Sequence, residues 1–190
     1  IGIIVIAIAI FPVLKIGGMQ LFQTEFSSKE DKVLPRTTTI ASGIGIVYFL
    51  LTIVCSLFLF LTGLSFFDSI AHAMTIIATG GFSTKDLSIG HYDSVYTEVV
   101  TIAFIIISSL PFILFFQALR GKIGDLFSNS QVHFFLILVF SVTLIVTIWL
   151  KKYYEVDFFQ SLRIAAFSVV SISTGSGFST YDFSVWGTFT

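Results

Sequence analysis

A glycine-rich stretch with several hydroxyl side chains occurs twice in this chain, as ATGGFSTKD over residues 78–86 (the first loop) and TGSGFSTYD over residues 174–182 (the second loop). Each copy ends an apolar segment about half as long as the apolar segments beside it. If these apolar segments enter a lipid bilayer, each loop lies part of the way across it. A loop there must face water or ions, because lipid offers its carbonyls no hydrogen-bond partner. Carbonyl oxygens can replace the water around a cation. The repeated stretch therefore predicts two loops that line a cation pathway.

Glycine suits such loops for a conformational reason. Lining up successive carbonyls demands backbone angles that a β-carbon disfavours, and a half helix that points its C-terminal end at the loop adds partial negative charge there. Each stretch alone would be an ordinary turn, but the recurrence of the wider motif favours a pore loop fixed at Gly81 and Gly177. The predicted ion-binding residues, chiefly through main-chain oxygens, are Thr79, Gly80, Gly81, Gly175, Ser176 and Gly177.

The residues after the glycines are candidates for support of the loops. Their serine/threonine-to-acid spacing is typical of a helix cap, and we expect them to tie the exit of each loop by hydrogen bonds. A further hypothesis is that the aspartates attract cations to the mouth, which Lys85 would oppose locally. These supporting residues are Ser83, Thr84, Asp86, Ser179, Thr180 and Asp182.

Other chemistry has little basis in the sequence. His72, His91 and His133 have no carboxylate or cysteine at metal-ligand spacing, so we expect no cofactor and no metal site other than one for the transported ion. His72 lies on the first short segment, where a packed or hydrogen-bonded role is expected. His72, Ser83 and Asp86 could be considered as the catalytic set of a serine hydrolase, but the sequence around them lacks the sharp turn and the oxyanion donors of such an enzyme. The chain is therefore not expected to be an enzyme.

Composition places the loops in an all-α integral membrane protein. Hydrophobic residues make up 55% of the 190 residues and charged residues only 11%, against roughly one quarter charged in soluble domains. Residues 37–67, 99–119 and 126–150 carry no charge, and each reaches the roughly 20 residues that cross a lipid bilayer. We expect three spans, with a kink at Pro111 in the second. The net charge of −1 argues against a nucleic-acid partner.

Two shorter apolar segments, residues 64–79 and 158–174, reach only about half way across the bilayer at 1.5 Å per residue. We expect re-entrant pore helices, the second longer by one turn, with Ser65 and Asp68 placed to cap the first. The connections away from the loops hold six Lys and Arg, and those beside the loops hold four. The positive-inside rule therefore predicts that the loops enter from the outer side.

Further motifs accompany the loops: IGGMQL at residues 16–21, FDSIAH at residues 67–72 and SIG at residues 88–90. Together they resemble, in order and spacing over nearly the whole chain, the Trk/Ktr family of potassium-translocating membrane subunits, in particular the TrkH type. The resemblance implies four span–pore helix–span repeats around a pseudo-fourfold pore for K+, with selectivity-filter glycines at Gly81 and Gly177. It also implies a multi-pass protein of the bacterial inner membrane, a homodimer and a cytosolic nucleotide-binding regulatory subunit.

The resemblance also divides the chain. It implies that residues 1–20 are the end of the second span of repeat one and that residues 21–36 are a cytosolic loop. Residues 37–119 would be the whole of repeat two, and residues 120–190 the first span, pore helix and loop of repeat three. The chain starts inside an apolar run and stops soon after the second loop, so we expect an internal piece of a longer protein. The second loop reads GSG where the family commonly has threonines before its glycine.

Two other functions stay open. A secondary transporter with broken helices would bind a cation or small substrate near the midplane, but it would normally need paired ionisable residues inside the spans, and residues 37–67 and 99–119 contain none. A membrane scaffold would leave the recurring loops unexplained.

Overall fold

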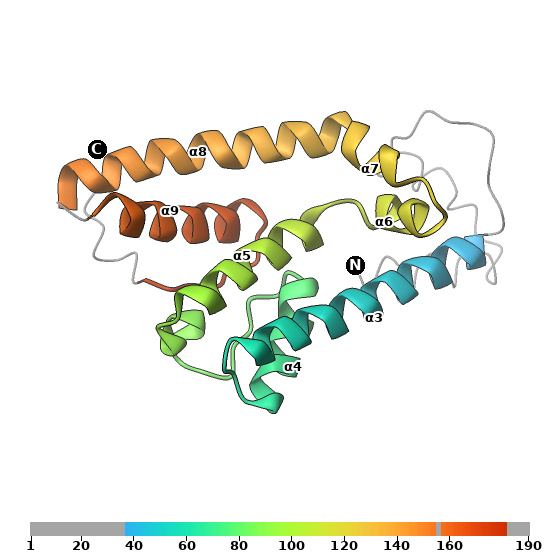
Figure 1. Cartoon of the computed structure of the whole chain (residues 1–190), viewed down its shortest axis with the longest axis horizontal. Helices are drawn as coiled ribbons and strands as arrows, with labels where there is room; N and C mark the ends of the chain where they lie inside the picture. The colour runs from blue at the N-terminus through green and yellow to red at the C-terminus, as the bar shows by residue number, and fades with distance from the viewer. Residues whose placement is uncertain (1–36, 155–156, 182–190) are drawn as a thin grey trace, which may run out of the picture.

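The computed structural model describes residues 37–154 and 157–181, which form helices joined by loops (Figure 1). The all-helical fold that the sequence predicts is confirmed for this part of the chain. The interpretations of residues 1–36 and of Asp182 lie outside the described residues. In chain order the helices are α3 (Thr37–Leu61), α4 (Phe66–Ile77), the 3-10 helix η1 (Ser88–Tyr92), α5 (Val95–Ser109), α6 (Phe112–Leu119), α7 (Ile123–Ser128), α8 (Ser130–Tyr154) and α9 (Phe158–Ser173).

Among the described residues, two helices are long and apolar enough to cross a membrane, with candidate spans at Ser42–Leu61 in α3 and Ser130–Tyr153 in α8. The remaining predicted span is divided into α5 and α6, which are bent by 89° relative to each other. Leu110 between them is extended, with ψ 151°, as is usual before a proline. Pro111 therefore ends one helix and starts another, where the sequence predicted a kink in a continuous span.

The two half helices have the predicted lengths. Helix α4 contains 12 residues and α9 contains 16, so α9 is longer by about one turn. Ser65 caps α4 as predicted, because its hydroxyl oxygen accepts a hydrogen bond from the backbone N–H of Asp68. Asp157 caps α9 in the same way through the N–H of Phe159. Both half helices end where a glycine loop begins.

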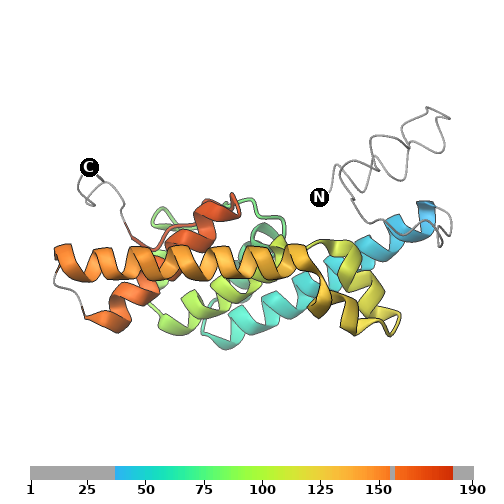
Figure 2. The same cartoon turned by 90° about the horizontal axis from the view of Figure 1, so that it is seen from above.

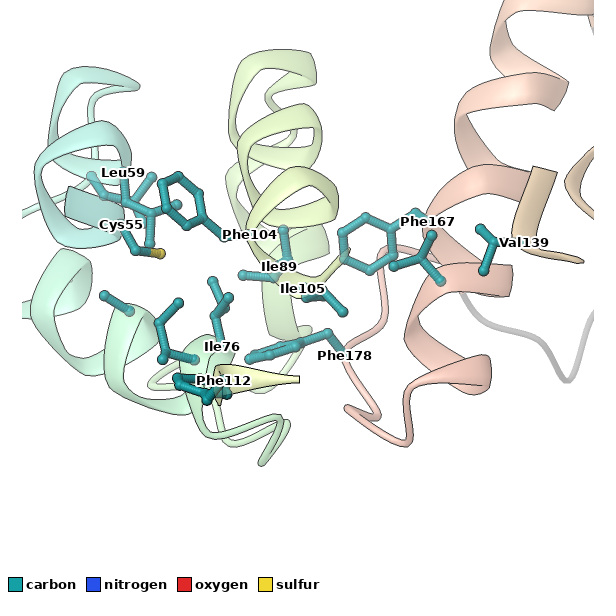
Figure 3. Packing of buried hydrophobic residues seen from close by; sticks show 14 of the residues in the cluster. Cys55, Leu59, Ile76, Ile89, Phe104, Ile105, Phe112, Val139, Phe167 and Phe178 are labelled. Atoms are coloured by element: carbon teal, nitrogen blue, oxygen red, sulfur yellow. The ribbon is translucent and has the colours of Figure 1, made fainter. Parts of the chain in front are cut away.

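Helix α5 lies between two helix pairs. Helix α4 packs on α3, α9 packs on α8, and α5 contacts α3, α4 and α9 (Figure 1). Seen from above, α9 crosses α8 at an angle (Figure 2). Cys55 is fully buried, which agrees with the packing role of a cysteine in an apolar run. The apolar side chains that join the two pairs through α5 include Ile76, Ile89, Ile105, Phe167 and Phe178 (Figure 3).

Gly43 in α3 allows α6 to approach closely. A β-carbon at Gly43 would overlap the ring of Phe116, and the guanidinium of Arg120 lies 4.4 Å from the centre of the same ring. We expect Gly43→Ala to lower the melting temperature in detergent, because overpacking costs about 1–3 kcal/mol. Gly45→Ala is the matched control, since a β-carbon there meets nothing within 4 Å. Equal melting temperatures for the two variants would contradict this packing.

Candidate functional site

The two glycine loops meet, although they are far apart in the sequence. A β-carbon at Gly81 would overlap the carbonyl oxygen of Ser176 and would lie 3.3 Å from the carbonyl carbon of Gly177. Gly81 also has a φ of 68°, a conformation that residues with a side chain rarely adopt. Any other residue at position 81 would therefore have to displace one of the two loops.

Both loops have the same alternation of backbone conformation. The angle φ is positive at Thr79 (51°) and Gly81 (68°) in the first loop and at Gly175 (70°) and Gly177 (75°) in the second, but not at the residue between each pair. Glycine adopts such angles without steric cost, whereas a β-branched threonine is an outlier that costs about 1–3 kcal/mol. Since strain of this kind clusters at functional sites, the conformation of Thr79 points to function at this loop.

Each loop is also folded back on its own half helix by the same hydrogen bonds. The Thr75 hydroxyl donates to the carbonyl oxygen of Phe82 (2.9 Å), and the Ser171 hydroxyl donates to that of Phe178 (2.6 Å). The carbonyl oxygens of Thr75 and Ser171 also each accept a backbone N–H of their own loop, at 2.8 Å in the first loop and 3.0 Å in the second. Sequence reasoning missed Thr75 and Ser171. Extending the comparison of the two copies upstream by one turn would have revealed them.

Beyond the glycines, η1 joins the exits of the two loops. The Gly90 N–H donates to the carbonyl oxygen of Ser179 (3.2 Å), and the Ser179 N–H donates to the hydroxyl of Ser88 (3.3 Å). A β-carbon at Gly90 would lie 2.7 Å from the carbonyl oxygen of Thr180. The predicted support residue Ser179 is thus held through its backbone by the segment that follows the first loop, and the backbone of Thr180 packs against Gly90.

The exit of the first loop is held by side chains of α4. The Thr84 hydroxyl donates to one carboxylate oxygen of Asp68 (2.6 Å), and the Lys85 ammonium lies 3.6 Å from the other. Ser83 Oγ lies 2.9 Å from Nε2 of His72. The hydrogen bond from Thr84 is the main cause that lowers the pKa of Asp68 to about 2, so this carboxyl stays ionised at neutral pH. Ser83 and Thr84 therefore tie the first loop to its half helix.

Asp86 is exposed and lies outside this network. The helix cap predicted from the spacing of Ser83, Thr84 and Asp86 is wrong, because η1 begins only at Ser88. Ser83 Oγ instead accepts a hydrogen bond from the N–H of Lys85 (3.1 Å), and Thr84 is bonded to α4. The chain turns back toward the half helix at this point, so no helix starts there.

An ion pair between a buried carboxylate and a partly exposed arginine joins α5 to α9. Arg163 Nε lies 3.2 Å from Oε2 of Glu98, and Glu98 is only 6% exposed. The pair connects the helix that follows the first loop to the helix that leads into the second. Sequence reasoning missed it, although a single arginine inside an apolar half helix indicates a buried partner. The sequence does not show which acidic residue that partner is.

Comparisons with known proteins match the whole chain. Residues 1–190 match the family model TrkH, described as a cation transport protein. The chain is 40% identical to the Trk system potassium uptake protein TrkH of Halomonas elongata, over 97% of the chain and 39% of that protein. It is 36% identical to the protein of the same name from Escherichia coli strain K12, over 99% of the chain and 40% of that protein.

Among solved structures, the crystal structure of the potassium transporter TrkH from Vibrio parahaemolyticus matches with a TM-score of 0.79 and 33% sequence identity. The match covers 97% of the chain and 37% of that protein. The chain thus spans less than half the length of the relatives that it matches.

Proposed function

Because the chain belongs to the TrkH family of cation transport proteins, we propose that it supplies two of the loops through which K+ crosses the bacterial inner membrane. The observation that carries the proposal is the contact of Gly81 with the carbonyl of Ser176. This contact brings main-chain oxygens of both loops together at the ends of two half helices. Potassium uptake is the activity named for the relatives from Halomonas and Escherichia coli.

The proposed ligands are main-chain oxygens of Thr79 and Gly80 in the first loop and of Gly175 and Ser176 in the second. The half helices α4 and α9 end at these loops, so the negative ends of their dipoles favour a cation there. The Ser176 hydroxyl is hydrogen-bonded to the hydroxyl of Thr174. Ser176 would therefore contribute through its main chain, and the serine in place of the threonine common in the family would leave the backbone ligands intact.

We also propose the assembly and orientation that the family resemblance implies. The loops would enter from the outer side, since the basic residues favour the opposite connections. The complete protein would be a homodimer that works with a cytosolic nucleotide-binding regulatory subunit. The name Trk system, which the relatives carry, is compatible with a transporter of several components.

A secondary transporter with broken helices is the competing function. The division between α5 and α6 and the ion pair of Glu98 and Arg163 favour it, since such transporters use helix breaks and ionisable groups. However, the two charges neutralise each other, which leaves neither of them for a substrate. The pore-loop function accounts for more of the geometry, because it also explains the recurring φ angles and hydrogen bonds.

The test compares two glycines with similar backbone strain. Gly177 (φ 75°) and Gly121 (φ 88°) both have open space where a β-carbon would lie, but only Gly177 is in a proposed ion-binding loop. The protein, expressed from its complete gene in cells without other K+ uptake systems, should support growth on low K+. Gly177→Ala should reduce the preference for K+ over Na+, whereas Gly121→Ala should cost only about 1–2 kcal/mol of stability. Identical ion preference in both variants would refute the assignment.

We expect Thr75→Val to loosen the first loop without disturbing α4. Valine keeps the shape of threonine but removes this hydrogen bond to the Phe82 carbonyl, which contributes about 0.5–1.5 kcal/mol. Discrimination of K+ from Na+ in uptake assays should fall by up to about tenfold, the effect of about 1.4 kcal/mol. Thr52→Val is the matched control, because the Thr52 hydroxyl donates to the Tyr48 carbonyl inside α3. An equal fall in both variants would contradict a role for Thr75 at the loop.

A further inference from the structure

We propose that His72 is a positioning residue that sets ion preference through the first loop, and that the second loop has no equivalent. The inference rests on the proposed function, because it concerns selection at the same loops. His72 does not touch the proposed ion path. It would act through Ser83, which follows the glycines by two positions.

The hydrogen bonds fix the protonation pattern of the His72 ring. The imidazole is fully buried, and its Nδ1 lies 2.7 Å from the carbonyl oxygen of Asp68. A carbonyl oxygen only accepts, so Nδ1 carries a proton, and in the neutral ring Nε2 is then an acceptor. The Ser83 hydroxyl, 2.9 Å from Nε2, therefore donates to His72 and uses its own oxygen to accept the N–H of Lys85. Each hydrogen bond from Asp68 through His72 and Ser83 to Lys85 therefore has a defined donor and a defined acceptor.

Neighbouring contacts make the His72 ring rigid. Tyr92 of η1 packs edge-on against it, with ring centres 5.6 Å apart and planes at 82°. One turn earlier on α4, Asp68 binds Thr84 and Lys85. Two side chains of the half helix thus hold three consecutive residues of the loop exit. The part of the loop that follows the proposed ligands is therefore tied to α4 by two side chains.

The second loop is held differently. When the two loops are aligned on Gly81 and Gly177, Ser168 takes the place of His72 and Ile164 takes the place of Asp68. The Ser168 hydroxyl donates to the carbonyl oxygen of Ile164 within α9 (2.7 Å), and isoleucine has no polar side-chain atom. The exit of the second loop is bonded to Ser88 and Gly90 of η1 instead.

This difference makes the two loops unequal in function. Carbonyl ligands select between cations by their number, field strength and cavity size, and a loop held at two points from its own half helix keeps that geometry most closely. The first loop would therefore provide most of the discrimination between K+ and Na+ that these two loops contribute. The second loop would depend on the first for its position, because η1 lies between their exits.

The test uses the protein expressed from its complete gene, with K+ and Na+ uptake measured per amount of folded protein. His72→Leu removes the hydrogen bonds to Asp68 and Ser83, and loss of the one to Ser83 should lower the K+/Na+ preference by about tenfold, equivalent to about 1.4 kcal/mol. His72→Gln, which keeps one donor and one acceptor, should restore part of that loss. Ser168→Ala is the control at the matching position, and because the Ser168 hydroxyl bonds within α9 it should change the preference by less than about twofold, equivalent to about 0.4 kcal/mol.

The possible outcomes separate the inference from the proposed function. If the unmodified protein takes up no K+, the proposed function fails. If it is selective and folded His72→Leu keeps the same preference, or Ser168→Ala loses as much, only the inference fails. Should His72→Leu not fold, Ser83→Ala removes the same hydrogen bond from the other side, together with the one from the Lys85 N–H. A tenfold loss in Ser83→Ala then supports the inference, and an unchanged preference overturns it.

Discussion

Replacement of Gly81 by alanine is expected to reduce K+ uptake by at least about thirtyfold, the effect of about 2 kcal/mol. The added β-carbon would overlap the carbonyl oxygen of Ser176, and the backbone at position 81 has a φ of 68°. The left-handed conformation costs about 1–2 kcal/mol for alanine, and overpacking adds about 1–3 kcal/mol. Because the overlapping group is backbone and not a flexible side chain, the two loops must separate. The measurement is the initial rate of K+ uptake at equal protein level.

Gly63→Ala is the matched control for this prediction. Gly63 also has a positive φ, 100°, but a β-carbon there would meet nothing within 4 Å. It should therefore lose only the stability that the strained backbone costs and should keep its ion preference. If Gly81→Ala transported K+ as fast and as selectively as Gly63→Ala, the contact between the two loops would have no functional role.

Replacement of Arg163 by leucine is expected to have the largest effect on stability. It would leave the Glu98 carboxylate, which is 6% exposed, without its cation. Removing one partner of a fully buried ion pair costs about 3–5 kcal/mol, and the 26% exposure of the Arg163 side chain places this pair toward the lower figure. The melting temperature in detergent should fall sharply, and K+ uptake should fall with it, because α5 and α9 hold the two loops against each other.

The double variant Glu98→Leu with Arg163→Leu tests whether the charge itself is the cause. With both charges removed, most of the lost stability should return, since apolar side chains can replace a buried pair at little net cost. Lys152→Leu is a control for loss of a basic residue, because Lys152 is exposed on α8, and its effect should stay within about 0.5 kcal/mol. A double variant as unstable as Arg163→Leu would contradict the ion-pair explanation.

The elements that the sequence predicted well are those encoded by local patterns. The half helices follow from apolar length and from the capping residue Ser65, and the loops follow from a motif that occurs twice. Recurrence was informative because the same hydrogen bonds hold both copies, through Thr75 and Ser171. Repeats of sequence and repeats of geometry coincide here.

The features that the sequence did not predict depend on residues brought together only in the fold. At Pro111 the chain is divided into two helices bent by 89° relative to each other, where a kink within one helix was predicted. Helix α6 is held by packing of Phe116 on Gly43, a contact that no local pattern shows. The partner of Arg163 could have been any acidic residue. The positive φ of Thr79 opposes its local preference, so surrounding contacts must impose it.

The most direct test of the ion pathway is diffraction from the complete protein crystallised with Rb+, whose anomalous signal locates a K+ substitute. The expected result is a peak between the two loops, next to the main-chain oxygens of Thr79, Gly80, Gly175 and Ser176. A protein that transports Rb+ but shows its bound ion away from both loops would contradict the assignment of these oxygens as the ligands.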